Sequence, residues 1–167
     1  MTAQDIKLRK GFTLIELLVV IGILAILLAI TLIAINPARQ FGQANDTKRR
    51  SDLTAILNAL GQYGASNGGN LPAEVAALTA GTATDLNSTN FPNLCAQLVP
   101  NYLPAIPKDP SANDQNGVEL ADCTAVGGWT TKGPGGSDGA YSITRDANNR
   151  ITVSATAPYA GPISVTR

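Results

Sequence analysis

Residues 11–38 read GFTLIELLVVIGILAILLAITLIAINPA, and this stretch determines the architecture of the chain. Glu16 is the one charged residue among these 28, and residues 17–35 contain no charge. A helix over residues 17–35 would span about 28 Å at the standard rise, close to the hydrocarbon thickness of a bilayer. The direct interpretation is one membrane crossing.

A polar leader, residues 1–11, precedes this stretch and ends in a basic cluster of Lys7, Arg9 and Lys10. Such a leader is typical of a targeting segment, and its basic residues favour a cytoplasmic N-terminus. Basic residues beyond the apolar stretch weaken this asymmetry: Arg39, Lys48, Arg49 and Arg50. A secretory signal peptide is a competing interpretation, but its apolar core of about 7 to 15 residues would end at a small-x-small site. The present stretch is longer and lacks that ending.

The composition narrows the classes of function. The chain has 167 residues, the length of one domain. Its 12 Lys and Arg balance 12 Asp and Glu, so no net charge attracts nucleic acid or anionic lipid. It has no His, which excludes His-dependent catalysis, and shows no Gly-rich phosphate loop or nucleophile–base pair. We therefore expect no enzyme and no zinc site.

Helical spacing resumes after the apolar stretch, over residues 37–66. An apolar stripe of this segment should pack on a globular core; its members are Leu53, Ile56, Leu57, Leu60 and Tyr63. Pro37 lacks an N–H and crowds the preceding turn, which predicts a kink rather than an end in one long helix over residues 12–66. The segment Asn67-Gly68-Gly69-Asn70 should end that helix.

Residues 67–167 are rich in Gly and Pro and should form a loop-rich head. A short helix is expected within residues 71–81, and a loop over residues 82–90, which contain the glycosylation-like triplet Asn87-Ser88-Thr89. Residues 141–145 and 150–155 alternate with period two, which predicts a β-hairpin that pairs Ile143 with Val153. Residues 163–166 would add an edge strand. The expected fold is α+β, a long helix on a small antiparallel sheet.

The segment Lys10-Gly11-Phe12-Thr13-Leu14-Ile15-Glu16 resembles the signal of type IV pilins and type II secretion pseudopilins. The resemblance covers the leader, the apolar helix and the long-helix-plus-sheet layout. It implies a type IV pilin-like fold, cleavage by prepilin peptidase between Gly11 and Phe12, and N-methylation of the new Phe12 amine.

Glu16 has a physical interpretation that agrees with the family role. An ionisable residue within an apolar helix is costly without a partner, and cleavage would create one, the free amine of Phe12. In the family this pair is taken to join neighbouring subunits and set their register. The alternative is a Glu16 side chain that reaches the lipid headgroups.

The remaining helix features leave alternatives open. Gly22 and Pro37 bracket the part of the helix most easily loosened, although both could be packing features. Residues 46–52, DTKRRSD, form a mixed charge run. We favour a solvated face there over salt bridges to neighbouring subunits or capture of DNA, and expect no specific nucleic-acid ligand.

Three features of the head remain. Cys95 and Cys123 both lie beyond the membrane segment, and a disulfide between them is favoured over two free thiols. Tyr102, Leu103 and Ile106, in a proline-rich segment, should dock on the helix. Oxygen ligands follow that segment, and the resemblance to pseudopilins implies that calcium could bind there, the alternative being a polar turn. The candidate ligands are Asp109, Asn113 and Asp114.

These observations favour a structural subunit of a type IV pilus-like filament. The resemblance implies a single-pass precursor in the cytoplasmic membrane. It then implies polymerisation with identical or related subunits, extracellular or periplasmic, at an assembly platform driven by a cytoplasmic ATPase. Adhesion, motility or DNA uptake would be properties of the whole filament. The alternatives are a type II secretion pseudopilin and a membrane-anchored binding domain that does not polymerise.

Overall fold

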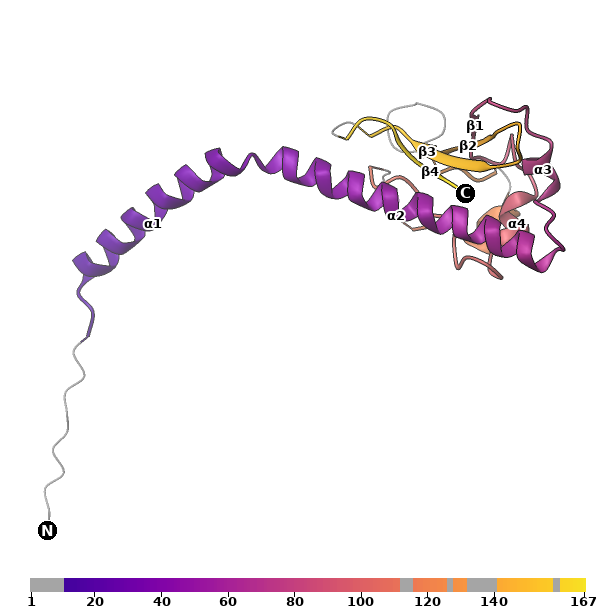
Figure 1. Cartoon of the computed structure of the whole chain (residues 1–167). Helices are drawn as coiled ribbons and strands as arrows, with labels where there is room; N and C mark the ends of the chain where they lie inside the picture. Colours follow the sequence, from indigo (N-terminus) through magenta and orange to yellow (C-terminus); the bar gives the residue numbers. More distant parts are fainter. Residues whose placement is uncertain (1–10, 112–115, 126–127, 132–140, 158–159) are drawn as a thin grey trace, which may run out of the picture. The chain divides into compact units, whose positions relative to one another are not determined.

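A computed structural model describes residues 11–111, 116–125, 128–131, 141–157 and 160–167 (Figure 1). The chain forms two compact units, Met1–Gln40 and Phe41–Arg167, which are described separately. The fold is α+β, with a long N-terminal helical segment and a small antiparallel sheet, as the sequence predicts.

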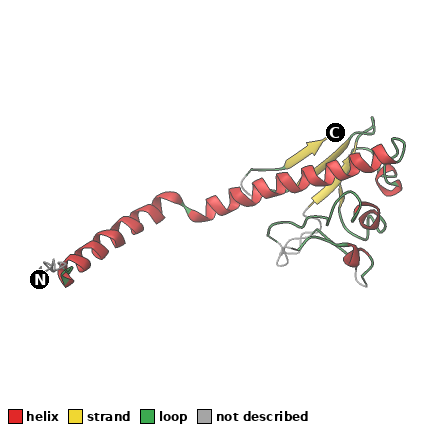
Figure 2. Ribbon diagram, turned by 90° about the horizontal axis from the view of Figure 1, so that it is seen from below, coloured by secondary structure: helices red, strands yellow, loops and turns green. Residues whose placement is uncertain are grey.

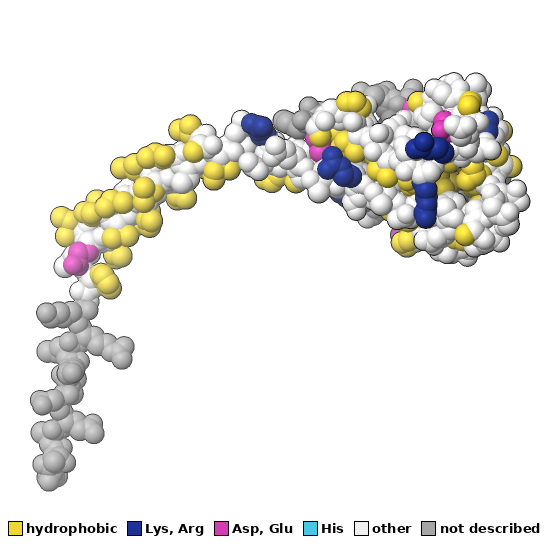
Figure 3. Space-filling view, in the orientation of Figure 1, with side chains coloured by type: hydrophobic (Ala, Val, Ile, Leu, Met, Phe, Trp, Pro, Cys, Tyr) yellow, Lys and Arg dark blue, Asp and Glu magenta, His cyan; other side chains and the backbone are white. Residues whose placement is uncertain are grey.

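Helix α1, Leu14–Ile35, is the main element of the first unit. None of its residues is buried, and hydrophobic side chains cover the face visible in Figure 3. The helix is long and apolar enough to cross a membrane, since 22 residues span about 33 Å. A helix with apolar residues on every side is not stable in water by itself, so lipid or other helices must cover it.

The helical segment predicted over residues 12–66 extends to Ser66, but it is interrupted at Asn36. Asn36 adopts the left-handed conformation, with φ 47° and ψ 79°, and a second helix, α2, begins at once over Pro37–Ser66. The residue before a proline is disfavoured in the α region, and Asn tolerates the left-handed region better than most residues. The interruption is therefore a break of one residue rather than a kink.

Helix α2 buries the predicted stripe: Leu53, Ile56, Leu57 and Leu60 are at most 5% exposed, and Tyr63 packs against the core. The helix ends as expected, because Gly68 and Gly69 have positive φ and the Gly69 N–H donates back to the Gly64 carbonyl at 2.8 Å. Figure 2 shows the strands along one side of α2.

The sheet has four antiparallel strands in the order β1-β2-β3-β4: Thr84–Asp85, Tyr141–Arg145, Ile151–Ala155 and Ile163–Thr166. The predicted pairing of Ile143 with Val153 is confirmed, and β4 joins β3 as the expected edge strand. Side chains on the inner face are buried: Tyr141, Ile143, Ile151, Val153 and Ala155. Hydroxyl pairs form on the other face, Ser142 with Ser154 at 3.1 Å and Thr152 with Thr166 at 2.8 Å.

The assignment of residues 82–90 to a loop needs correction. Thr84 and Asp85 form β1 by pairing with Ile143 and Ser142, and Leu86 is fully buried. Thr and Asp give a weak strand signal, and the pairing comes from β2, which lies more than 50 residues away in the sequence.

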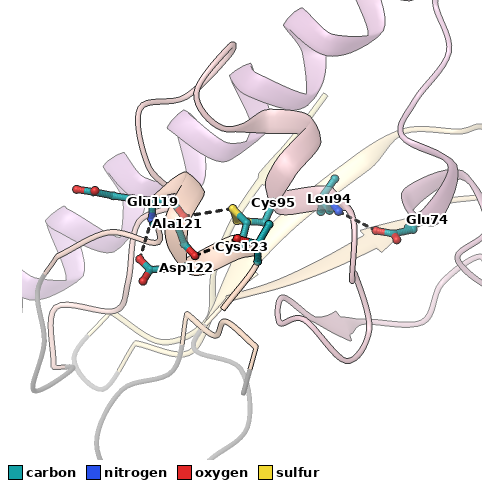
Figure 4. The surroundings of a disulfide bond; sticks show 8 residues. Glu74, Leu94, Cys95, Glu119, Ala121, Asp122 and Cys123 are labelled. Atoms are coloured by element: carbon teal, nitrogen blue, oxygen red, sulfur yellow. Dashed lines mark hydrogen bonds between the residues drawn. A yellow bond between two sulfur atoms is a disulfide. The ribbon is translucent and has the colours of Figure 1, made fainter. Parts of the chain in front are cut away.

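Three short helices lie between the long helix and the hairpin: α3 Ala73–Ala76, α4 Leu94–Leu98 and α5 Leu120–Cys123. Helix α3 falls within the range predicted for a short helix, whereas α4 and α5 were not predicted. The Glu74 carboxylate caps the start of α4 by accepting from the Asn93 and Leu94 N–H groups at 2.9 and 3.0 Å (Figure 4). Ile106 is buried, and Tyr102 packs edge-on against Tyr63 with ring centroids 5.6 Å apart.

Candidate functional site

Gly11 and Phe12, the residues of the expected cleavage site, lie just before α1 in non-helical backbone. Both are exposed, Phe12 to 83%, and an added Cβ at Gly11 would meet nothing within 4 Å. The basic residues of the leader, Lys7, Arg9 and Lys10, lie outside the described residues. The peptide bond between Gly11 and Phe12 is thus accessible from all sides in the described part of the chain.

Glu16 sits in the first turn of α1 and forms a capping box with Thr13. The Glu16 Oε2 atom accepts from the Thr13 backbone N–H at 2.8 Å and from the Thr13 hydroxyl at 2.6 Å. In return the Glu16 N–H donates to Thr13 Oγ1 at 3.3 Å. A capping box satisfies two N–H groups that the helix leaves without a partner, which explains why the helix begins here.

The capping box uses only one oxygen of the carboxylate. Both hydrogen bonds from Thr13 fall on Oε2, and Oε1 accepts no hydrogen bond from any residue that the structure describes. A carboxylate can accept several hydrogen bonds in distinct directions. Glu16 can therefore keep its cap and still receive a cation from outside the chain.

The other residues singled out in the apolar helix lie in different settings. Gly22 is inside the intact helix α1, and an added Cβ there would meet nothing within 4 Å. Pro37 is the first residue of α2, where the missing N–H costs nothing, because that group would have no partner in the helix. Loosening of the helix at Gly22 stays a prediction.

The charge run at residues 46–52 is not the uniform solvated face that the sequence favoured. Asp46 and Arg49 are each 4% exposed, whereas Lys48 and Arg50 are exposed. Arg49 Nη1 donates to Asp46 Oδ1 at 2.8 Å, and Arg49 Nε and Nη2 donate to the two Asp109 oxygens at 2.7 and 2.9 Å. The bidentate pair with Asp109 spans 60 residues of sequence, which is why the charge run alone could not reveal it.

This cluster of Asp46, Arg49 and Asp109 joins three segments of the second unit. Asp46 Oδ2 also accepts from the Ala160 N–H at 2.8 Å, and the Ser111 N–H and hydroxyl donate to Asp109 Oδ1. Burial alone would raise the pKa of the Asp109 carboxyl, but hydrogen bonds from Arg49 and Ser111 hold that pKa below its ordinary value. The hydrogen bond to Asp109 likewise raises the pKa of the Arg49 guanidinium.

A further carboxylate of α2, that of Asp52, accepts a hydrogen bond from the Tyr141 hydroxyl. The buried Tyr141 donates its hydroxyl to Asp52 Oδ2 at 2.8 Å, and Lys48 Nζ lies 2.9 Å from the same oxygen. Burial, followed by the bond to Asp52, raises the pKa of Tyr141. Asp52 thus joins α2 to β2 through Tyr141, and the pair of Arg49 and Asp109 joins α2 to the segment that holds Asp109.

The proposed calcium ligands are only partly described. Asp109 has both oxygens engaged by Arg49, while Asn113 and Asp114 lie outside the described residues. Within the described part of the chain no group of three His, Cys, Asp or Glu residues could hold a metal ion. Calcium at this position stays a prediction, and an ion there would share the Asp109 oxygens with Arg49 or displace it.

Cys95 of α4 and Cys123 of α5 form a disulfide, with Cα atoms 5.4 Å apart (Figure 4). Cys95 is fully buried, and the Cys123 Sγ lies 3.3 Å from the Glu119 carbonyl oxygen. The bond closes a loop around the segment that contains Asp109 and leaves the hairpin outside. The bond thus links two helices of only five and four residues, which have few side chains for packing.

Comparison with known proteins gives one match. Residues 6–32 match the prokaryotic N-terminal methylation motif, a structural signal rather than an enzyme family. Searches of curated proteins and of solved structures found no match. The matched residues include Gly11, Phe12 and Glu16 and most of the apolar helix. The chain therefore carries the prepilin-type signal of type IV pilins and pseudopilins.

Proposed function

We propose that this protein is a structural subunit of a type IV pilus-like filament that polymerises through α1 after prepilin peptidase has removed residues 1–11. The observation that carries this proposal is the pairing of an accessible Gly11–Phe12 bond with a helix whose apolar residues are exposed on every side.

The exposed apolar side chains of α1 must be covered first in the precursor and then in the filament. A bilayer covers the helix of the precursor, since its length fits one membrane crossing. The basic residues of the leader support a cytoplasmic N-terminus. In a filament, identical or related helices would replace the lipid by packing apolar side chains against one another. An assembly platform in the membrane, driven by a cytoplasmic ATPase, would supply the work of this transfer.

Glu16 would guide the transfer. Cleavage gives Phe12 a free amine, and the Oε1 atom of Glu16 is open to a cation. An amine of one subunit placed against Glu16 of another neutralises both charges, which is the condition for burying them among apolar helices. The Thr13 cap can persist in that arrangement because it uses Oε2.

Calcium is a separate, accessory proposal. An ion held by Asp109, Asn113 and Asp114 would compete with Arg49 for the Asp109 oxygens. A rise in the stability of the head on addition of calcium, reversed by chelation, would support it. No effect of calcium on that stability would contradict it.

The test of the filament proposal compares Glu16→Gln with Glu119→Gln in the native cells. Both changes remove one exposed carboxylate charge, but Glu119 lies in the head. We expect the wild type and Glu119→Gln to yield sheared surface filaments whose subunits begin at methylated Phe12, and Glu16→Gln to lose at least about 90% of them. N-terminal sequencing and intact mass identify the processed chain.

Other outcomes have definite meanings. A processed, methylated chain that never reaches the surface but forms periplasmic assemblies with a secretion machinery would indicate a pseudopilin. An uncleaved chain retained in the membrane, with no effect of Glu16→Gln, would contradict polymerisation and indicate an anchored binding domain.

A further inference from the structure

The sequence contains two triplets of the form Asn-x-Ser/Thr, and the structure treats them differently. They are Asn45-Asp46-Thr47 in α2 and Asn87-Ser88-Thr89 in the turn that follows β1. An enzyme that glycosylates such a triplet must reach the Asn amide and the hydroxyl two residues later at the same time. The backbone conformation therefore decides which triplet can be an acceptor.

The triplet in α2 cannot present both groups. Residues two apart on a helix do not share a face, so the Asn45 amide and the Thr47 hydroxyl point in different directions. The Thr47 hydroxyl donates to the Gln43 carbonyl at 2.9 Å, and the Asp46 between them is 4% exposed within the cluster with Arg49. Reaching both groups would require local unfolding of α2.

The triplet after β1 presents both groups from one turn. The Asn87 Oδ1 atom accepts from the N–H groups of Thr89 and Asn90, each at 3.0 Å, which draws the Asn87 side chain over Thr89. Asn87 Nδ2, at the other end of the planar amide, donates to no residue that the structure describes. Thr89 is exposed, and within the described residues its backbone N–H donates a hydrogen bond while its hydroxyl makes none.

The middle residue anchors this turn to the head. The Ser88 N–H donates to the Trp129 carbonyl at 2.9 Å, and Asn87 pairs with Thr130 in an isolated bridge. The Ser88 side chain lies against Gly128, so close that a Cβ at Gly128 would collide with Ser88 Oγ. Contacts of Ser88 with residues 128 and 129 therefore hold the turn in place, while the amide of Asn87 and the hydroxyl of Thr89 remain available to an enzyme.

We propose that Asn87 is an N-glycosylation site, modified by a membrane transferase that uses a polyprenyl-diphosphate-linked sugar as donor. A bond forms between Asn87 Nδ2 and the anomeric carbon of the sugar, and the bond from that carbon to the diphosphate oxygen breaks. The diphosphate leaves with the electron pair, and a carboxylate of the transferase takes the amide proton. The proposal goes beyond filament assembly and rests on the placement of the head on the export side of the membrane.

The test uses the full chain purified from its native cells, reduced to open the Cys95–Cys123 disulfide and digested with trypsin. The two triplets fall on separate peptides, residues 40–48 and residues 51–108, because cleavage follows Lys and Arg. We expect a glycan mass on the peptide of residues 51–108, localised to Asn87, and none on the peptide of residues 40–48.

Two substitutions of Thr89 form the matched pair. Thr89 is exposed and its side chain makes no hydrogen bond within the described residues, so neither change should disturb the fold. Thr89→Ser should keep the glycan, and Thr89→Val should lose at least about nine tenths of it. Asn45→Gln should leave the glycan unchanged.

An unmodified Asn87 in a chain whose Phe12 is cleaved and methylated would overturn this proposal and leave the filament proposal intact. A glycan at Asn45, or one on a Ser or Thr that survives Thr89→Val, would overturn it too. An uncleaved chain with an unmodified Asn87 would contradict both proposals.

Discussion

Arg49 is the residue whose burial is least expected from its neighbours in the sequence. Its side chain is 5% exposed, and its guanidinium contacts one carboxylate from its own helix and one from a segment 60 residues away. A buried cation with paired partners contributes little net stability, but removal of one partner is costly, because the buried guanidinium then loses charge-assisted hydrogen bonds that water does not replace. Asp109 therefore decides whether Arg49 can remain inside.

The change Asp109→Asn should lower the free energy of unfolding of the head by about 3 kcal/mol near neutral pH, because Arg49 then keeps only Asp46. Denaturant titration of the full chain in detergent can measure this through the fluorescence of Trp129, the single Trp, which is 4% exposed. Lys48→Ala, which breaks the more exposed pair with Asp52, should cost under about 1 kcal/mol. Equal losses in the two variants would contradict the role of Asp109.

The same pair predicts a dependence on pH. The pKa of Asp109 is lowered in the folded state, so its contribution is complete above its unfolded value of about 3.9 and disappears as pH falls through the lower folded value. The difference in stability between the wild type and Asp109→Asn should therefore shrink as the pH is lowered below about 4. A difference that stays constant across that range would show that the charge of Asp109 is not what stabilises the head.

At the scale of elements, the boundary between α1 and α2 depends on two residues. Asn36 adopts the left-handed conformation and Pro37 supplies no N–H, so the helical hydrogen bonds stop and restart within one residue. Asn36 also helps to start α2, because its carbonyl accepts from the Arg39 N–H at 3.1 Å. Asn36 and Pro37 thus together end α1 and begin α2.

The double change Asn36→Ala and Pro37→Ala should join α1 and α2 into one helix. Proline inside a helix is about 3 kcal/mol less favourable than Ala, whereas Asn36→Ala alone leaves the restriction imposed by Pro37. The Cα chemical shift of residue 36 in micelles should become helical in the double variant and stay non-helical in the single one. A helical shift already present in the wild type would contradict the break.

At the scale of the whole molecule, the sequence predicts the elements with local patterns and misses those that depend on distant partners. The apolar run of α1 is continuous and the alternation of β2 and β3 has a period of two, so both were predicted, including the pairing of Ile143 with Val153. Strand β1 was missed because its two residues are ordered by β2. The burial of Arg49 was missed because Asp109 approaches only in the folded head.

The candidate site follows the same division. Gly11, Phe12 and Glu16 lie within six residues, so their relationship can be inferred from the sequence, and the motif match covers all three. The Thr13–Glu16 capping box is also local and could have been predicted from its spacing. Helix α4 gave no comparable signal, because it is capped by Glu74 from another segment.

The disulfide limits how far the head can extend when the chain is pulled. The bond joins residues 28 apart through Cα atoms separated by 5.4 Å, so a pulling force bypasses the enclosed segment. About 90 Å of extended backbone is thereby withheld from stretching even when the rest of the head gives way. The hairpin lies outside this closed loop, and only non-covalent contacts hold it against α2 under load.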